Sequence, residues 1–355
     1  MNRQIQKLIQ SIEPIHQERM GETEAYLDTL TKPPGSLGRL EDIAVRLSGI
    51  TGQEAPPVSP PGILVFAGDH GIVEEGVSAF PQEVTVQMIR NFLEGGAAIN
   101  VFARKIGAEL QVVDVGAVSE IQNERLVSRK IAAGTRNFLK TDAMTKQQAH
   151  AALLAGIESA EEMIARGIKC LILGEMGIGN TTPASAIVSV LTGCSVEKAV
   201  GYGTGISDDK KLHKKSVIEE AVRLRDPDRT DPIDVLKKLG GFEIAAISGA
   251  ILAAGKARIP VIIDGLICTS GAMVACRLNA NIKDYLMAGH VSLEPGHRIA
   301  LEDIGLEPLL DLELKLGEGT GAALAFPLLE AAVRMRNEMA TFDSARVTNK
   351  GRPIQ

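Results

Sequence analysis

The strongest constraint on the fold is an alternation of short apolar runs with longer, helix-like stretches along the middle of the chain. The runs at 63–67 (ILVFA) and 261–263 (VII) have the length and composition of fully buried strands. Buried strands that alternate with helices are typical of a parallel sheet covered on both faces. The sequence therefore predicts an α/β fold, with a mostly parallel sheet and helices on both of its faces.

Further strands are expected near 109–116 and 168–174, and each apolar run is followed by a helical pattern. The segment TTPASAIVSVL opens a helix in which Thr181 or Thr182 is a plausible N-cap and Pro183 lies in the first turn. The other helices expected in this region span 82–105, 143–166, 208–224, 242–256 and 269–279.

The two chain ends lie outside the alternating region. Residues 1–50 are expected to form helix, loop and helix, a Pro/Gly-rich linker follows at 54–62, and a C-terminal helix covers about 319–340. A chain of 355 residues is long enough for two domains. We expect a small helical domain from residues 1–60 and 320–355, and a large α/β catalytic domain from residues 61–319.

Composition argues against several classes of partner. Aromatic residues make up 3% of the chain, tryptophan is absent and the net charge is -6, which does not suit a nucleic-acid surface. No apolar stretch approaches the roughly 18 residues of a membrane helix, and the charged N-terminus does not resemble a secretory signal. The four cysteines form no C-x-x-C motif, so we expect buried thiols in a cytoplasmic protein.

A glycine-rich turn is expected after the strand near 168–174. In GEMGIGNTT (174–182), Gly177 and Gly179 let backbone N–H groups approach an anion, and a helix opens at Thr181. The turn lacks the Lys-Ser/Thr ending of a Walker A loop, and an ordinary tight strand-to-helix turn remains an alternative. A second glycine loop at 201–205, around Gly203, precedes a helix whose Lys214 could reach a phosphate.

A lone carboxylate stands between glycines in LGEGTG (316–321), directly before an apolar helix. Glu318 could be a general base whose pKa rises when it is partly desolvated. It could equally be a glutamate that interacts favourably with the start of the helix.

The remaining polar motifs do not predict a metal site. Asp69, His70, His290 and His297 form neither an HExxH motif nor a Cys/His cluster. The segment VIIDGLICTSG (261–271) is similar in outline to the acid-pair motif of phosphoribosyltransferases that use the pyrophosphate donor with magnesium. The acid pair is broken, because Asp264 is followed by Gly265. No metal and no cofactor are predicted.

Several of these motifs together resemble the nicotinate-nucleotide–dimethylbenzimidazole phosphoribosyltransferase family of cobalamin biosynthesis. The resemblance covers nearly the whole chain in one order and implies a homodimer with a Rossmann-like domain and a small domain built from both chain ends. The matching stretches are KPPGSLGRLE (32–41), GDHGIVEEGVSAFPQEVT (68–85), GEMGIGNTTPASA (174–186), GGFEIAAISGA (240–250), DG (264–265) and LGEGTGAALA (316–325).

The resemblance also implies an activity, the transfer of the phosphoribosyl group of nicotinate mononucleotide to 5,6-dimethylbenzimidazole. Glu318 matches the family's base, and Glu175 matches a second carboxylate. The acceptor could instead be adenine, another benzimidazole or a phenol. A magnesium-dependent phosphoribosyltransferase and a non-catalytic nucleotide-binding regulator remain alternatives. The residues expected to bind substrate are Gly177, Gly179, Asn180, Thr181, Gly203, Lys214 and Asp264, with Phe80 and Met88 at the aromatic-base pocket.

Overall fold

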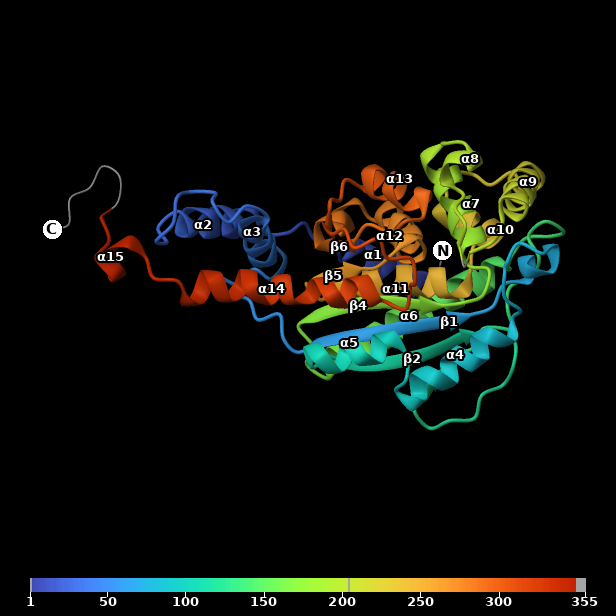
Figure 1. Cartoon of the computed structure of the whole chain (residues 1–355), viewed down its shortest axis with the longest axis horizontal. Coiled ribbons are helices and arrows are strands. Elements are labelled where there is room, and N and C mark those ends of the chain that lie inside the picture. Colours follow the sequence, from blue (N-terminus) through green and yellow to red (C-terminus); the bar gives the residue numbers. More distant parts are fainter. Residues whose placement is uncertain (1, 204, 349–355) are drawn as a thin grey trace.

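The computed structural model describes residues 2–203 and 205–348, and these fold around one sheet in which every strand pair is parallel (Figure 1). Within the described ranges the sheet has seven strands in the order β3-β2-β1-β4-β5-β6-β7. The predicted α/β fold with a parallel sheet is confirmed. The strands are β1 (Pro61–Gly68), β2 (Glu109–Gly116), β3 (Leu126–Ser128), β4 (Cys170–Met176), β5 (Val261–Ile263), β6 (Leu286–His290) and β7 (Pro308–Leu310).

Helices cover both faces of the sheet because the central strands are apolar on both sides. Every residue of β1 is buried. One face packs against α6 (Lys146–Ala165), α11 (Phe242–Lys256) and α12 (Leu266–Leu278), and the other against α4 (Glu83–Glu94), α5 (Ala98–Ile106) and α14 (Thr320–Glu338). The remaining helices of the sheet region are α7 (Thr181–Thr192), α8 (Val196–Ala199), α9 (Asp208–Arg225), α10 (Pro232–Leu239), α13 (Pro295–Ile304), η1 (Gly71–Glu75) and η2 (Ala280–Tyr285).

Segments from near both chain ends meet in an extension at one side of the molecule, whereas the N-terminal helix itself lies beside the sheet (Figure 1). It contains α2 (Gln17–Leu27), α3 (Arg39–Thr51) and α15 (Phe342–Ala345), together with the far end of α14. Backbone hydrogen bonds from Thr31 N to the Ala340 carbonyl (3.0 Å) and from Phe342 N to the Thr29 carbonyl (2.9 Å) join the two ends.

The predicted boundary between two domains stays a prediction. Helix α14 begins against β4, β5 and β6 and also packs on α3 in the extension. Helix α1 (Arg3–Gln10) packs against α6 and α11 beside the sheet, although it was expected in the small domain.

Local signals placed most elements but missed some of their ends. The predicted helix 82–105 is two helices, because the chain turns at Gly95 (φ 84°) between α4 and α5. The cap of α7 is Asn180, one residue before the predicted Thr181 or Thr182, while Pro183 does lie in the first turn. The strands β3, β6 and β7 and the helices α8, α10 and α13 were not predicted.

Candidate active site

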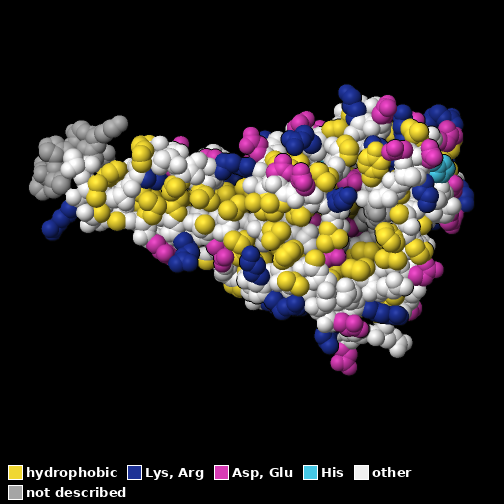
Figure 2. Space-filling view, in the orientation of Figure 1, with side chains coloured by type: hydrophobic (Ala, Val, Ile, Leu, Met, Phe, Trp, Pro, Cys, Tyr) yellow, Lys and Arg dark blue, Asp and Glu magenta, His cyan; other side chains and the backbone are white. Residues whose placement is uncertain are grey.

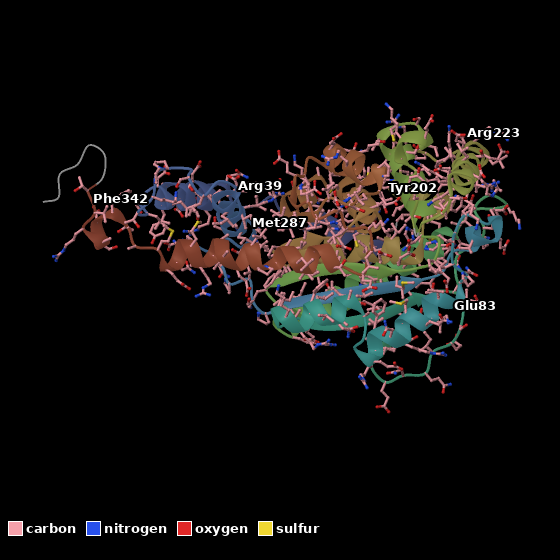
Figure 3. The ribbon with its side chains drawn as sticks, in the orientation of Figure 1. Arg39, Glu83, Tyr202, Arg223, Met287 and Phe342 are labelled. Atoms are coloured by element: carbon pink, nitrogen blue, oxygen red, sulfur yellow. The ribbon has the colours of Figure 1, made fainter. Side chains whose placement is uncertain are left out.

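The predicted polar residues gather at the carboxyl edge of the sheet. Glu175 lies near the end of β4, Asp264 directly follows β5, and His290 ends β6. In such sheets ligands bind beyond this edge, where the strand order reverses, here between β1 and β4. In Figure 3, Tyr202 of the second glycine loop and Glu83 at the start of α4 lie on opposite sides of this part of the molecule.

Glu318 lies in a strained turn directly before α14. Its φ is 63°, between Gly317 (φ 92°) and Gly319 (φ 91°), so three consecutive residues are left-handed. This conformation costs a residue with a side chain about 1–2 kcal/mol, so the surroundings must hold it in place. A Cβ at Gly174 would lie 2.1 Å from the Glu318 carbonyl oxygen, which shows how closely the turn packs against β4.

The Glu318 carboxylate is buried, with 5% of the residue exposed. Its Oε2 accepts a hydrogen bond from the backbone N–H of Ile99 at 3.2 Å, in the first turn of α5. Burial raises the pKa of Glu318 and the charge of Asp264 adds to this rise, while the Ile99 hydrogen bond opposes it. A carboxylate with a raised pKa suits a general base near neutral pH.

Glu175 is the second buried carboxylate of this group. Burial, together with the charges of Glu243 and Asp264, raises its pKa to about 8, although a hydrogen bond from Asn180 Nδ2 to its Oε2 opposes the rise. A Cβ on Gly317 would lie 2.5 Å from Glu175 Oε1, so this side chain is adjacent to the turn that carries Glu318. At pH 7 the neutral acid is therefore the main form of Glu175.

A buried lysine forms the other end of the site. Lys214 is 1% exposed, and its Nζ donates a hydrogen bond to Thr181 Oγ1 at 2.7 Å. A Cβ on Gly203 would lie 2.9 Å from Thr181 Oγ1 and 3.5 Å from Lys214 Nζ. Burial lowers the pKa of Lys214 to about 8, partly offset by the charge of Glu294. The structure thus brings three predicted phosphate-binding residues together.

The first glycine loop connects β4 to α7 against the end of β1. Gly179 has φ 86°, and a Cβ there would lie 2.5 Å from Val73 Cγ2, while one on Gly177 would lie 2.2 Å from the Gly68 carbonyl oxygen. Asn180 precedes α7 and makes no side-chain cap, and its Nδ2 donates to Glu175. Thr182 N donates to the Gly179 carbonyl at 3.0 Å, and no side chain caps the first turn of α7, so this helix N-terminus favours an anion.

Asn180 and Thr181 join the two ends of the site. Asn180 donates to Glu175 at the carboxylate end, and the adjacent Thr181 accepts from Lys214 at the other end. A ligand with a phosphate near Lys214 and a reacting centre near the carboxylates would pass over the N-terminus of α7.

Asp264 has other partners than those expected of a substrate-binding residue. Its Oδ2 accepts from Gly319 N at 3.1 Å, and its Oδ1 accepts from Ala322 N at 3.0 Å and lies 3.2 Å from His290 Nε2. Its predicted contact with substrate stays a prediction.

Phe80 and Met88 belong to α4 and to the loop that leads into it. Phe80 is half-exposed in the loop before α4, and Met88 is half-buried within it. The Thr85 hydroxyl of the same helix accepts from Ile178 N at 3.1 Å, so α4 is attached to the first glycine loop. The predicted aromatic-base pocket at 80–88 stays a prediction.

Sequence reasoning gave no role to several polar residues at this edge. His70 Nε2 lies 2.9 Å from Glu243 Oε1, and both side chains are fully buried. Glu294 Oε1 accepts from Gly203 N at 2.7 Å. His70 and Glu243 lie in motifs that carry the family resemblance, which was a usable signal. Nothing in the sequence could have identified Ile99, since it contributes only a backbone N–H.

The described residues contain no group of three or more His, Cys, Asp or Glu side chains with the geometry to hold a metal ion. Within the same ranges, no helix is both long and apolar enough to cross a membrane.

Comparisons with known proteins agree with this geometry. Residues 12–347 match a protein-family model described as "Phosphoribosyltransferase". The nicotinate-nucleotide–dimethylbenzimidazole phosphoribosyltransferase of Geobacter sp. (strain M21) is 51% identical over 346 residues, covering 97% of this chain and 99% of the relative. The same-named protein of Geobacter sulfurreducens is 52% identical over 335 residues, covering 94% and 95%. The crystal structure of the Thermus thermophilus protein of this name superposes with a TM-score of 0.90 at 44% identity, covering 94% of this chain and 100% of that one.

Proposed function

The chain belongs to the nicotinate-nucleotide–dimethylbenzimidazole phosphoribosyltransferase family, and we propose that it transfers the phosphoribosyl group of nicotinate mononucleotide to 5,6-dimethylbenzimidazole. The products are α-ribazole 5′-phosphate and nicotinate. The observation that carries the proposal is the meeting of two opposite groups at Asn180 and Thr181. A buried lysine with glycine loops lies on one side, and a strained, buried Glu318 lies on the other.

The phosphate end fixes the donor. The 5′-phosphate binds to Lys214, Thr181 and the N–H groups at the start of α7, which places C1′ toward the carboxylates. Lys214 forms no ion pair within the described ranges, and burial disfavours its charged form. The negative charge of a bound phosphate would stabilise the charged lysine.

At the carboxylate end, Glu318 removes one proton from the acceptor. A ring nitrogen of the benzimidazole attacks C1′ while the bond from C1′ to the pyridinium nitrogen breaks, and the bonding pair returns to nicotinate as a neutral ring nitrogen. The other ring nitrogen of the acceptor loses its proton to Glu318 Oε. Attack from the face opposite nicotinate converts a β-linkage into an α-linkage. No general acid is needed, because the leaving group departs without a proton.

Glu175 is close enough to Glu318 to act in the same step. Positive charge on the pyridinium and on the ribosyl carbon would favour its ionised form, although the neutral acid prevails in the free protein at pH 7. We propose that Glu175, ionised when the donor is bound, stabilises this positive charge electrostatically.

A magnesium-dependent mechanism that uses the pyrophosphate donor is the weaker alternative. Such enzymes need a free acid pair for the ribose hydroxyls and the metal. Here Asp264 accepts two backbone hydrogen bonds and contacts His290, and its neighbour is Gly265. Full activity in excess chelator would agree with our proposal, and a requirement for added magnesium would contradict it.

We also propose that the protein is a cytoplasmic homodimer. Support for the dimer comes from an apolar stripe along α14, visible in Figure 2, in which Leu324, Pro327, Leu328 and Ala331 are half-buried or exposed at helical spacing. The four cysteines are free, in keeping with a reducing compartment. Light scattering of the purified protein tests the dimer.

The direct test is turnover with a single donor and competing acceptors. Purified protein is given nicotinate mononucleotide with 5,6-dimethylbenzimidazole, adenine and a phenol, and the products are identified by mass and by the configuration at C1′. The α-linked dimethylbenzimidazole nucleotide should dominate. A dominant adenine or phenol product would mean that this base, and not 5,6-dimethylbenzimidazole, is the acceptor. Absence of turnover would refute the function.

A further inference from the structure

We propose that Asp264 and His290 act as a buried positioning pair that holds Glu318 in place as the base, and that neither residue contacts the substrate. The proposal rests on the function given above, in which Glu318 accepts the acceptor's proton. It assigns a role to His290 and replaces the expected substrate contact of Asp264 with a structural one.

Asp264 accepts its hydrogen bonds from the segment that carries Glu318. Both oxygens are used by the turn that carries Glu318, with Gly319 N at 3.1 Å on Oδ2 and Ala322 N at 3.0 Å on Oδ1. These two donors belong to the residue after Glu318 and to the first turn of α14. Asp264 thus binds the start of α14, and its position decides where the left-handed turn lies.

His290 holds Asp264 from the other side. Its Nε2 lies 3.2 Å from Asp264 Oδ1, and both residues are at least 98% buried, with exposures of 2% and 1%. The Asp264 carboxylate can only accept, so His290 donates through Nε2. Burial opposes the charged imidazolium, but the hydrogen bond and charge of Asp264 outweigh this and raise the pKa of His290.

Close packing transmits the position of β6 to α14. A Cβ on Gly321 would lie 1.9 Å from His290 Cδ2, and one on Gly289 would lie 2.5 Å from Ala322 Cα. The imidazole therefore rests directly against the first turn of α14, with no side chain between them. Gly174 of β4 presses on the Glu318 carbonyl from the opposite side. The turn is held by three adjacent strands, which explains how a strained φ of 63° persists at Glu318.

Several charged and polar groups face Glu318 and His290 and affect their pKa values. Glu318 faces Asp264, the carboxylate of Glu175 and the N–H of Ile99 at the start of α5. His290 is affected by Asp264, Asp311 and His297. His297 Nδ1 accepts from Ser292 N at 2.9 Å, and burial lowers its pKa to about 3, so it remains neutral beside His290.

The test compares Asp264→Asn, His290→Leu and His290→Gln in the full chain. Asparagine keeps the shape of Asp264 but sets an amide N–H against a backbone N–H, whereas glutamine can replace the Nε2 donor of His290. We expect kcat to fall about 10- to 100-fold in Asp264→Asn and less in His290→Leu, because a misplaced base slows the chemical step. His290→Gln should recover most of the loss, and the KM for nicotinate mononucleotide should change little throughout.

A second readout does not depend on turnover. The ¹³Cδ signal of Glu318, assigned with Glu318→Gln, reports its titration, and loss of the Asp264 charge should move the midpoint to lower pH. Tyr285→Phe is the matched control, because it removes a partly buried hydrogen bond to the Glu13 carbonyl (2.8 Å) at the opposite end of β6 from His290. It should leave both kcat and the midpoint unchanged.

Two results would overturn the pair. An unchanged Glu318 midpoint in Asp264→Asn would mean that the Glu318 carboxylate is not held beside Asp264. It would refute the positioning pair whether or not the wild-type protein turns over. A raised KM at unchanged kcat would return Asp264 to substrate binding. Absence of wild-type turnover together with a shifted midpoint would refute the proposed function alone.

Discussion

The carboxylate end and the phosphate end of the site are both buried, yet burial shifts the pKa values at the two ends in opposite directions. At one end the pKa values of Glu318 and Glu175 are raised, and at the other the pKa of Lys214 is lowered. In both places burial disfavours the charged form, since the protein supplies little opposite charge. In the complex that we propose, the donor carries the missing partners, a pyridinium for the carboxylates and a phosphate for the lysine. The free protein therefore holds groups whose partners arrive with the substrate.

The largest expected effect concerns the base. Glu318→Gln keeps the shape and the Ile99 hydrogen bond but cannot accept a proton, so kcat should fall by about 10²–10⁴. Because the folded-state pKa is raised, wild-type kcat should decline as pH drops through that value, and this limb should vanish in the variant. Steady-state kinetics from pH 5 to 9 provides the measurement. Near-normal turnover of the variant would place the base elsewhere, with Glu175 as the next candidate.

The second effect is on stability at the phosphate end. A pKa near 8 in place of 10.5 means that charged Lys214 destabilises the free fold. This penalty is present in full below about pH 8 and fades as pH rises to 10.5, and it amounts to about 3 kcal/mol at pH 7. Lys214→Met should therefore raise the free energy of unfolding at pH 7 by up to this amount. Urea unfolding at pH 7 and pH 10 measures it, and a less stable variant at pH 7 would contradict it.

The same substitution should weaken donor binding. Loss of one charge-assisted hydrogen bond to phosphate costs about 1.5–3 kcal/mol, which corresponds to a roughly 10- to 100-fold higher Kd for nicotinate mononucleotide. Free dimethylbenzimidazole lacks a phosphate and should bind unchanged, as calorimetry with each ligand would reveal. Equal losses for both ligands would mean that the lysine only supports the fold.

The smallest effect distinguishes the two carboxylates. With a pKa of about 8, Glu175 is mostly neutral at pH 7, and an amide imitates a neutral acid. In the absence of donor, Glu175→Gln should leave the unfolding free energy at pH 7 almost unchanged. A drop in kcat at pH 7 would indicate that Glu175 ionises once the donor binds, as proposed, and unchanged kcat would limit it to a structural role.

Much of the fold followed from local signals. The runs at 63–67 and 261–263 became β1 and β5, and the glycine-rich turn at 177–180 lies between β4 and α7. β6 (LMAGH) and β7 (PLL) escaped prediction, although β5 (VII), which is no longer than they are, was predicted. All residues of β5 are β-branched and favour a strand, whereas β6 and β7 contain no β-branched residue, so pairing with neighbouring strands decides whether they form.

The site divides in the same way. Residue type and glycine context made Glu318, Lys214 and the first glycine loop candidates, and their roles stay predictions. The partners that set their chemistry come from distant positions in the chain. Ile99 is separated from Glu318 by 219 positions, and Asp264 is separated from Gly319 by 55.

The sequence by itself determined the fold class, the family and the chemically capable residues, because these depend on local periodicity and on motifs that stand in one order. Only the tertiary structure decided the charge states, the strained geometry of Glu318 and the His290–Asp264 contact. The physical reason is that pKa values and backbone strain depend on burial and on neighbours in space, and three strands far apart in the chain create that environment.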